Sequence, residues 1–264
     1  MGLPANPIDG AEGPQFHTGT GPQSLVPFPV WGWADLLRVV GVLFLALFFA
    51  DTAAVLIAHT LWPAYSSTHT LSSDPRLVVP SQGVAYLLTV WFVKRMITHY
   101  HIGFFQAVHW NFPERWPRFL FGGLGLAVVI QLLSAGLPIP KQLPIEQFFQ
   151  SPADAWMMAV FGTLVAPFCE ELFFRGLLFP TVLRRLGMIA AVVVTAGLFA
   201  LIHASQLGRS WPAVAMLFVV GVVLTLVRAR AHSLAASVLV HAGYNLALFS
   251  LLYVGTAGFR NFSR

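Results

Sequence analysis

Seven apolar segments, each about as long as a bilayer-crossing helix, follow one another along this chain of 264 residues. They lie at about 36–61, 77–93, 119–137, 153–179, 188–204, 212–227 and 233–254. A helix needs about 20 apolar residues to cross the hydrocarbon core, and it satisfies its backbone hydrogen bonds internally, as lipid requires. The sequence therefore predicts an all-α fold, a polytopic transmembrane helical bundle with about seven to eight spans.

Charged residues are scarce and are placed mainly at the ends of the apolar segments. They make up 9% of the chain, against about 25% in soluble domains. Basic residues follow the second, fourth and sixth segments and precede the third, which predicts that these ends are cytoplasmic. We expect a multi-pass protein of the inner or plasma membrane, if the source is bacterial, with a cytoplasmic N-terminus. The net charge of +5 then reflects topology and contact with lipid head groups, and no nucleic-acid partner is expected.

Composition divides the chain into three regions. Residues 1–30 contain no Lys or Arg and are rich in Gly and Pro, which predicts a mobile N-terminal tail. Residues 31–118 are interpreted as N-terminal membrane helices followed by an interfacial segment at 99–118. Residues 119–264 are interpreted as the catalytic core. Interfacial anchoring is expected of six tryptophans, which are Trp31, Trp33, Trp62, Trp110, Trp116 and Trp211.

The fourth apolar segment carries Glu170, Glu171 and Arg175. A charge at the centre of a bilayer costs about 3 kcal/mol even on lenient scales, so such residues indicate a functional site. Glu171 and Arg175 are four residues apart and share a helical face, which allows them to pair. Glu170 has Phe174 as its i+4 neighbour and no partner in its own helix, which leaves it available as a general base. The alternative is that all three residues only hold helices together.

Two later segments supply further polar groups. Phe199 and His203 share one helical face, and His241 and Asn245 share another, one turn apart. Two converging donors can stabilise an oxyanion, although a histidine or such a pair can also serve only as an interhelical hydrogen bond. At 1.5 Å per residue, Glu170 lies about 15 Å beyond Pro180. His203 lies about 20 Å or more from the start of its segment, a depth that fits poorly.

The order Glu-Glu-x-x-x-Arg, Phe-x-x-x-His and His-x-x-x-Asn over about residues 150–250 resembles the CAAX proteases and bacteriocin-processing enzymes, relatives of the Ras-converting type II CAAX prenyl endopeptidase. The resemblance implies hydrolysis of peptide bonds inside the membrane. Glu170 would take a proton from a water that His203 helps to orient. His241 and Asn245 would hold the oxyanion. Glu171 and Arg175 would belong to the catalytic set and would fix the helix and the local field. Phe174 and Phe199 would support the substrate or the structure of the site.

The resemblance leaves the cofactor and the substrate open. The family has also been interpreted as zinc-dependent, with Glu170, His203 and His241 as ligands, a donor set that is adequate for zinc. We favour the mechanism without a metal, because the His-Glu-x-x-His spacing of common zinc proteases is absent. The expected substrate is a membrane-associated protein or peptide. It could be a prenylated CAAX protein, as in CAAX-box protein maturation, a leader peptide, a bacteriocin precursor or a membrane anchor.

Other functions and nucleophiles fit the residues less well. Buried acids and histidines also build transporters and proton pathways, and the same fold could act as a silent immunity or scaffold protein. Cys169 is interpreted as a small buried residue and Ser237 as a hydroxyl bonded to its own helix. Asp51 is interpreted as an anchor or polar contact.

Overall fold

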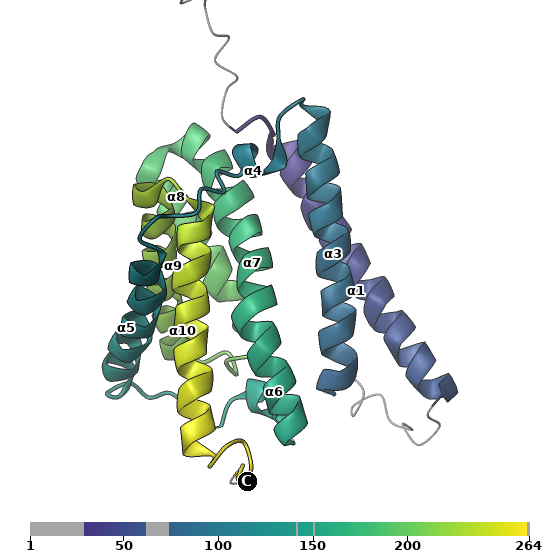
Figure 1. The fold of residues 1–264 in the computed structure, drawn as a ribbon, viewed down its shortest axis with the longest axis vertical. Helices are drawn as coiled ribbons and strands as arrows, with labels where there is room; N and C mark the ends of the chain where they lie inside the picture. The colour runs from purple at the N-terminus through teal and green to yellow at the C-terminus, as the bar shows by residue number, and fades with distance from the viewer. Residues whose placement is uncertain (1–28, 62–73, 141, 150, 263–264) are drawn as a thin grey trace, which may run out of the picture.

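The structure is a computed structural model that describes residues 29–61, 74–140, 142–149 and 151–262. The predicted mobile tail lies almost entirely outside these residues. Every regular element within the described residues is a helix, and six helices there are long and apolar enough to cross a membrane. The predicted all-α membrane bundle is therefore confirmed (Figure 1).

Two long helices form an antiparallel pair at one side of the bundle (Figure 1). They are α1 (Trp33–Leu61) and α3 (Pro75–His99). A short helix, α4 (Phe104–Ala107), follows at the same end of the bundle as the start of α1, within the segment predicted to be interfacial. The next long helix, α5 (Trp116–Ser134), leads to a 3-10 turn, η1 (Pro144–Phe148).

A single long helical run, Pro152–Ile202, carries most of the predicted site residues. It consists of α6 (Pro152–Val160), a π-helical turn η2 (Phe161–Val165), α7 (Ala166–Glu171), a second π-helical turn η3 (Leu172–Leu178) and α8 (Phe179–Ile202). Each π turn ends two residues before a proline, Pro167 or Pro180. Widening the helix lets it continue past a ring that would collide with the carbonyl four residues earlier. The predicted stop of the fourth segment at Pro180 is therefore wrong.

The chain reverses inside α8, at Gly187, whose φ of 78° and ψ of 178° are not helical. A glycine adopts such a positive φ without strain. The reversal is evident from the Arg175 guanidinium, which lies 4.5 Å from the Phe199 ring centroid, although a straight helix would separate the two residues by about 36 Å. The run thus counts as two of the predicted seven segments, so the six runs of the described residues correspond to the seven predicted segments.

The reversal also accounts for the poorly fitting depth of His203. Glu170 precedes Gly187 by 17 positions and His203 follows it by 16. The two residues therefore lie at nearly equal distances from the turn. The prediction placed the two residues at different depths because it ended one helix at Pro180 instead of Leu186.

Two further helices complete the bundle, α9 (Trp211–Ala231) and α10 (Leu234–Gly255). Helices α10 and α5 lie side by side (Figure 1). Their backbones approach each other very closely at Gly123 and Gly243. A Cβ atom added at Gly123 would lie 2.1 Å from the Val240 carbonyl oxygen, and one at Gly243 would lie 2.1 Å from the Leu120 carbonyl oxygen. Small residues at this crossing let the two backbones touch.

Side-chain contacts attach the α1–α3 pair to the rest of the bundle at both ends. At one end, Trp31 is buried, and its indole N–H donates to the Leu177 carbonyl (3.2 Å) and the Thr181 hydroxyl (3.0 Å). At the other end, Arg76 Nε lies 3.3 Å from Asp154 Oδ1. The expectation that Trp31 anchors the protein at the membrane interface is wrong, because its ring is covered by protein.

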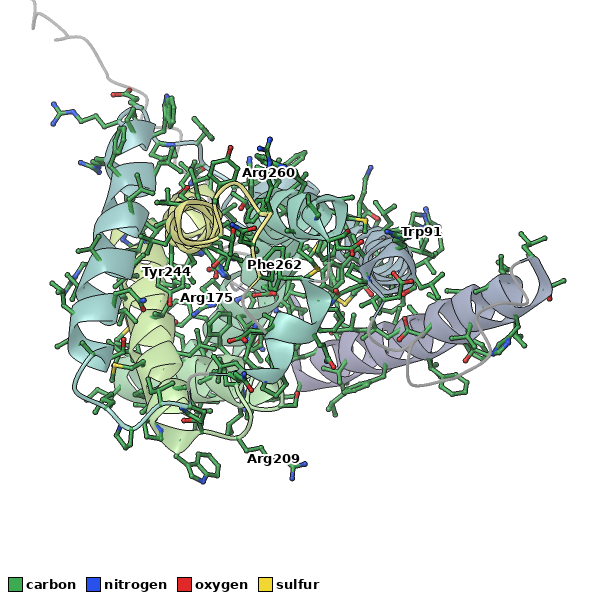
Figure 2. The ribbon with its side chains drawn as sticks, turned by 90° about the horizontal axis from the view of Figure 1, so that it is seen from below. Trp91, Arg175, Arg209, Tyr244, Arg260 and Phe262 are labelled. Atoms are coloured by element: carbon green, nitrogen blue, oxygen red, sulfur yellow. The ribbon has the colours of Figure 1, made fainter. Side chains whose placement is uncertain are left out.

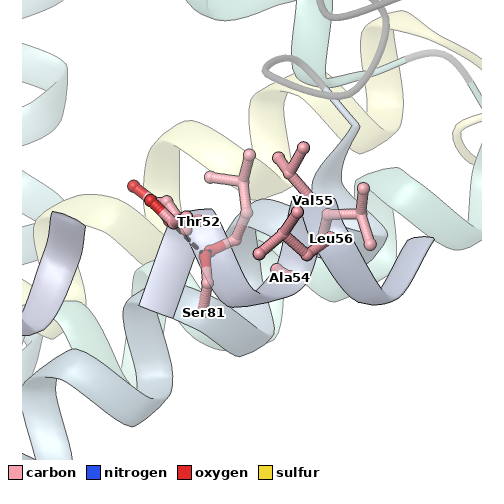
Figure 3. Close-up of a pocket in the computed structure, with 8 residues that line it drawn as sticks. Thr52, Ala54, Val55, Leu56 and Ser81 are labelled. Atoms are coloured by element: carbon pink, nitrogen blue, oxygen red, sulfur yellow. Dashed lines mark hydrogen bonds between the residues drawn. The ribbon is translucent and has the colours of Figure 1, made fainter. Parts of the chain in front are cut away.

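A polar contact inside the α1–α3 pair accounts for Asp51. The Ser81 hydroxyl donates to Asp51 Oδ1 over 2.5 Å, beside a cavity of about 410 Å³ between the two helices (Figure 3). This confirms Asp51 as a polar contact. Within the described residues, the hydrogen bond of Asp51 joins α1 to α3 and does not reach the rest of the bundle.

The glycine contact predicts a position-specific loss of stability. Gly123→Ala would force α5 away from the α10 backbone and should lower the free energy of unfolding by about 1–3 kcal/mol. Gly122→Ala is the matched control, because a Cβ atom there meets nothing within 4 Å. Thermal unfolding in detergent measures both variants. Equal melting temperatures for the two would contradict the close approach.

Candidate active site

The centre of the bundle contains a buried ion pair. Arg175 and Glu171 are both fully inaccessible to solvent, and Arg175 Nη1 lies 2.9 Å from Glu171 Oε1. Figure 2 shows Arg175 among the helices, whereas Trp91 and Arg209 lie at the edge. The predicted pair therefore forms, between the last residue of α7 and the π turn η3.

The guanidinium of Arg175 also binds two neighbouring helices. It donates to the Gly221 carbonyl (2.9 Å) and the Thr225 hydroxyl (3.3 Å) on α9. Its face lies over the Phe199 ring on α8, at 4.5 Å from the centroid, where the ring quadrupole attracts the cation. The sequence analysis did not identify these α9 partners. Gly221 supplies a backbone oxygen, so no spacing pattern signals it.

Glu171 extends the ion pair to α10. Its Oε1 atom lies 2.9 Å from His241 Nδ1. An ionised carboxylate only accepts hydrogen bonds, so the proton of this bond belongs to Nδ1. The bond turns the other ring nitrogen, Nε2, toward Glu170.

His203 is oriented in the same manner by its own helix. Its Nδ1 atom lies 2.8 Å from the Phe199 carbonyl oxygen. Because a carbonyl only accepts, Nδ1 carries the proton. His203 is the C-cap of α8, and its ring lies against Phe199 with the centroids 4.9 Å apart. The Nε2 atom of His203 also faces Glu170.

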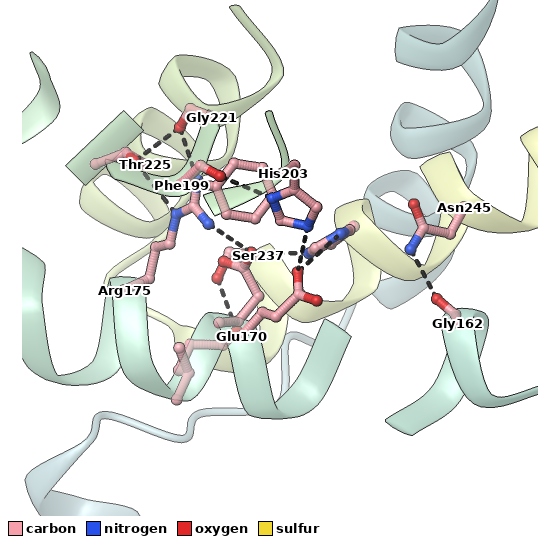
Figure 4. Close-up of polar contacts among 12 residues, drawn as sticks. Gly162, Glu170, Arg175, Phe199, His203, Gly221, Thr225, Ser237 and Asn245 are labelled. Carbon is pink, nitrogen blue, oxygen red and sulfur yellow. Dashed lines mark hydrogen bonds and ion pairs between the residues drawn. The ribbon is translucent and has the colours of Figure 1, made fainter. Parts of the chain in front are cut away.

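Glu170 meets both imidazoles at one point (Figure 4). Its Oε2 atom lies 3.9 Å from His203 Nε2 and 3.8 Å from His241 Nε2. Both distances exceed a direct hydrogen bond, which leaves space for a small bridging group such as water. The side chain of Glu170 is 17% exposed. The structure thus brings Glu170, His203 and His241 together, and their catalytic roles remain predictions.

Asn245 lies to one side of this cluster (Figure 4). Its Nδ2 atom donates to the Gly162 carbonyl over 2.7 Å. In a π turn that carbonyl would receive the N–H five residues later, but position 167 is a proline and has none. Asn245 therefore satisfies an otherwise unpaired carbonyl, and its second N–H is left over for another acceptor.

The two predicted support residues form an aromatic wall beside the cluster. The Phe174 and Phe199 rings meet edge to face with centroids 5.4 Å apart, and Phe199 meets the His241 ring at 5.6 Å. Both phenylalanines are buried. Both rings contact Arg175, and Phe199 also contacts both imidazoles. Apolar rings lower the local dielectric constant and so strengthen the charged interactions beside them.

A cavity of about 310 Å³ reaches Glu170 from the α1–α3 side. Its walls come from α1, α3, α7, η3 and α8, and they are mostly apolar. Tyr86 on α3 is among the few polar side chains in the lining. The sequence analysis did not single out this residue. The available signal was the i, i+4 spacing of Gln82 and Tyr86 in an apolar segment.

The zinc alternative can be examined on the same residues. Glu170, His203 and His241 are chemically suitable ligands, and their facing atoms are 3.8 and 3.9 Å apart. Within the described part of the chain, no group of three or more His, Cys, Asp or Glu side chains is arranged to hold a metal ion. Glu170, His203 and His241 are the residues that would hold a zinc ion. The choice between a zinc-dependent and a metal-free mechanism stays a prediction, and no step below is derived through a metal.

The buried pair predicts a strong and asymmetric effect on stability. Arg175→Met should lower the free energy of unfolding by about 3–5 kcal/mol, because it leaves the Glu171 charge buried and unpaired. The double variant Glu171→Leu/Arg175→Met should recover much of this loss. Arg38→Met is the control, since Arg38 pairs with Asp35 while its side chain is 66% exposed and should cost at most about 1 kcal/mol. Thermal unfolding in detergent would contradict the account if the Arg175 and Arg38 variants were equally stable.

Comparison with known proteins finds one family model that is similar to the segment carrying this site. Residues 152–247 match the family model described as "Type II CAAX prenyl endopeptidase Rce1-like". A search of curated proteins and a search of solved structures each gave no match. The matched segment contains every predicted site residue, from Glu170 to Asn245. Residues 152–247 of this chain are therefore similar to the Rce1-like type II CAAX prenyl endopeptidases.

Proposed function

We propose that this protein is an intramembrane endopeptidase that hydrolyses peptide bonds of membrane-associated proteins or peptides by means of a water activated by Glu170. One observation carries the proposal. The carboxylate of Glu170 faces the Nε2 atoms of His203 and His241 at 3.9 and 3.8 Å inside an apolar bundle. The family model that matches residues 152–247 describes endopeptidases, which supports the same class of reaction.

The hydrogen bonds of the two imidazoles give them different roles. His203 donates its Nδ1 proton to Phe199, so the Nε2 lone pair of its neutral form accepts a hydrogen bond from water. A water placed there directs one O–H at His203 and the other at Glu170. The water oxygen then keeps a lone pair for attack on a carbonyl carbon.

We assign His241 as the donor to the oxyanion, with a proton on each ring nitrogen. Its Nδ1–H is held by Glu171, and its Nε2–H would point into the site. The charges of Glu170, Glu171, Arg175 and this imidazolium then sum to zero, which buried groups favour. The second N–H of Asn245 would be the other donor. Each such donor contributes about 3–4 kcal/mol to the transition state in acyl transfer.

The reaction follows from these positions. The water oxygen bonds to the carbonyl carbon of the scissile peptide while Glu170 takes one water proton. The carbonyl oxygen becomes an oxyanion held by His241 and Asn245. When the C–N bond breaks, Glu170 returns the proton to the leaving nitrogen. The products are a carboxylic acid and an amine, and Glu170 is restored.

Cleavage of a fluorogenic peptide tests the proposed base. The purified protein in lipid nanodiscs would receive a farnesylated CAAX peptide or an unprenylated membrane-spanning peptide. Glu170→Gln should lower kcat by at least about 10²–10⁴-fold, the usual contribution of a general base, with little change in KM. Glu146→Gln is the matched control, because Glu146 is exposed and lies in η1.

Two outcomes would contradict this proposal. Normal cleavage of the same peptide by Glu170→Gln would remove Glu170 from its role. Loss of wild-type cleavage on addition of a chelator, followed by recovery with zinc, would replace the water mechanism by a metal-dependent one.

A further inference from the structure

We propose that Tyr86, on helix α3 outside the family-matched segment, is a substrate-contacting residue. Its phenol hydroxyl would donate a hydrogen bond to a backbone carbonyl of the peptide that lies against Glu170, and so would set which peptide bond reaches the carboxylate. The proposal rests on the endopeptidase function above and adds a residue to it.

Tyr86 and Glu170 line the same cavity from opposite elements. The cavity holds about 310 Å³ between the α1–α3 pair and the run from α7 to α8. A peptide bound at Glu170 in this cavity would therefore have α7 on one side and Tyr86 on the other.

A peptide backbone in this cavity needs hydrogen-bond donors. Burying an unpaired carbonyl costs about 1–3 kcal/mol in proteins. The lining that faces Glu170 from α1 is apolar, and it consists of Val39, Val40, Leu43 and Phe44. On α3, the Thr89 hydroxyl already donates to the Ala85 carbonyl at 2.8 Å, and Cys169 is only a weak donor. Tyr86 is the strong neutral donor that this lining offers.

The surroundings of Tyr86 leave its hydroxyl proton available. The ring stacks on Phe161, with centroids 6.0 Å apart and planes inclined by 13°. The hydroxyl oxygen accepts a hydrogen bond from Gln82 Nε2 at 3.1 Å. Within the described residues, no acceptor takes the hydroxyl proton itself. The stacked ring and the hydrogen bond from Gln82 fix the position of the hydroxyl group. The hydroxyl is therefore preorganised to donate its proton to a carbonyl of a bound peptide.

Contacts at both ends of the α1–α3 pair fix the position of the Tyr86 hydroxyl relative to the rest of the bundle. Trp31 joins the pair to η3 and α8 at one end, and Arg76 joins it to Asp154 on α6 at the other. Tyr86 lies between these two attachments along α3. The α1–α3 pair thus forms a second wall of the site at a defined distance from Glu170.

A binding measurement tests Tyr86 separately from catalysis. The fluorescent farnesylated CAAX peptide and the unprenylated membrane-spanning peptide would be titrated into Glu170→Gln protein, which does not turn them over. Adding Tyr86→Phe to this background removes the hydroxyl and keeps the ring on Phe161. We expect affinity for the peptide that binds to fall by about three- to tenfold, the effect of one neutral hydrogen bond. Adding Tyr253→Phe, which removes a phenol at the far end of α10, should leave affinity unchanged.

Each outcome decides between the two proposals. Equal affinity with and without the Tyr86 hydroxyl would overturn the role of Tyr86 and leave the function of Glu170 intact. An equal loss in the Tyr253→Phe control would also overturn it, because the effect would not be local. Failure of the Glu170→Gln protein to bind either peptide, together with no cleavage by the wild type, would overturn the endopeptidase proposal itself. In otherwise wild-type protein, Tyr86→Phe should lower kcat/KM by a similar factor without shifting its pH profile.

Discussion

A guanidinium buried at the centre of a membrane bundle is the constraint around which this structure is arranged. Arg175 must find a counter-charge and acceptors within the protein, because lipid offers none. It takes the counter-charge from Glu171, acceptors from α9 and a ring face from Phe199 on α8. These contacts fix three helices around one cation. Glu171 then bonds His241 and adds α10 to the same network.

This network explains why the neighbouring Glu170 differs from Glu171. Both are glutamates on one helical turn, but only Glu171 is paired with Arg175 and fully enclosed. Glu170 points into a cavity and faces two imidazole nitrogens at longer range. Glu171 orients His241, and Glu170 is the carboxylate to which we assign the role of the base. The family match ends at residue 247 and begins at 152, whereas α1 and α3 supply the opposite wall of the cavity, so the complete site draws on both parts of the chain.

Spacing along a single helix was the reliable guide to this site. The i, i+4 relation of Glu171 to Arg175 and of Phe199 to His203 predicted contacts that the structure contains. Features that depend on backbone conformation were not predictable from spacing. The two π turns let one helix continue past Pro167 and Pro180, and the positive φ of Gly187 then reverses the chain. Glu170 and His203 therefore lie at nearly equal distances from the turn, which the sequence analysis did not predict. Contacts between distant segments, such as Trp31 with Leu177 or Tyr86 with Phe161, had no local signal.

The most direct test of the central network is the proton position on His241. Nitrogen-15 NMR of histidine-labelled protein in lipid distinguishes protonated from bare imidazole nitrogens. The His241→Gln spectrum would assign the signals among the nine histidines. The account predicts a protonated Nδ1 on His241, since Glu171 can only accept. A bare Nδ1 with the proton on Nε2 alone would contradict it, because the hydrogen bond that joins the Arg175–Glu171 pair to His241, and so to the imidazole that faces Glu170, would then be absent.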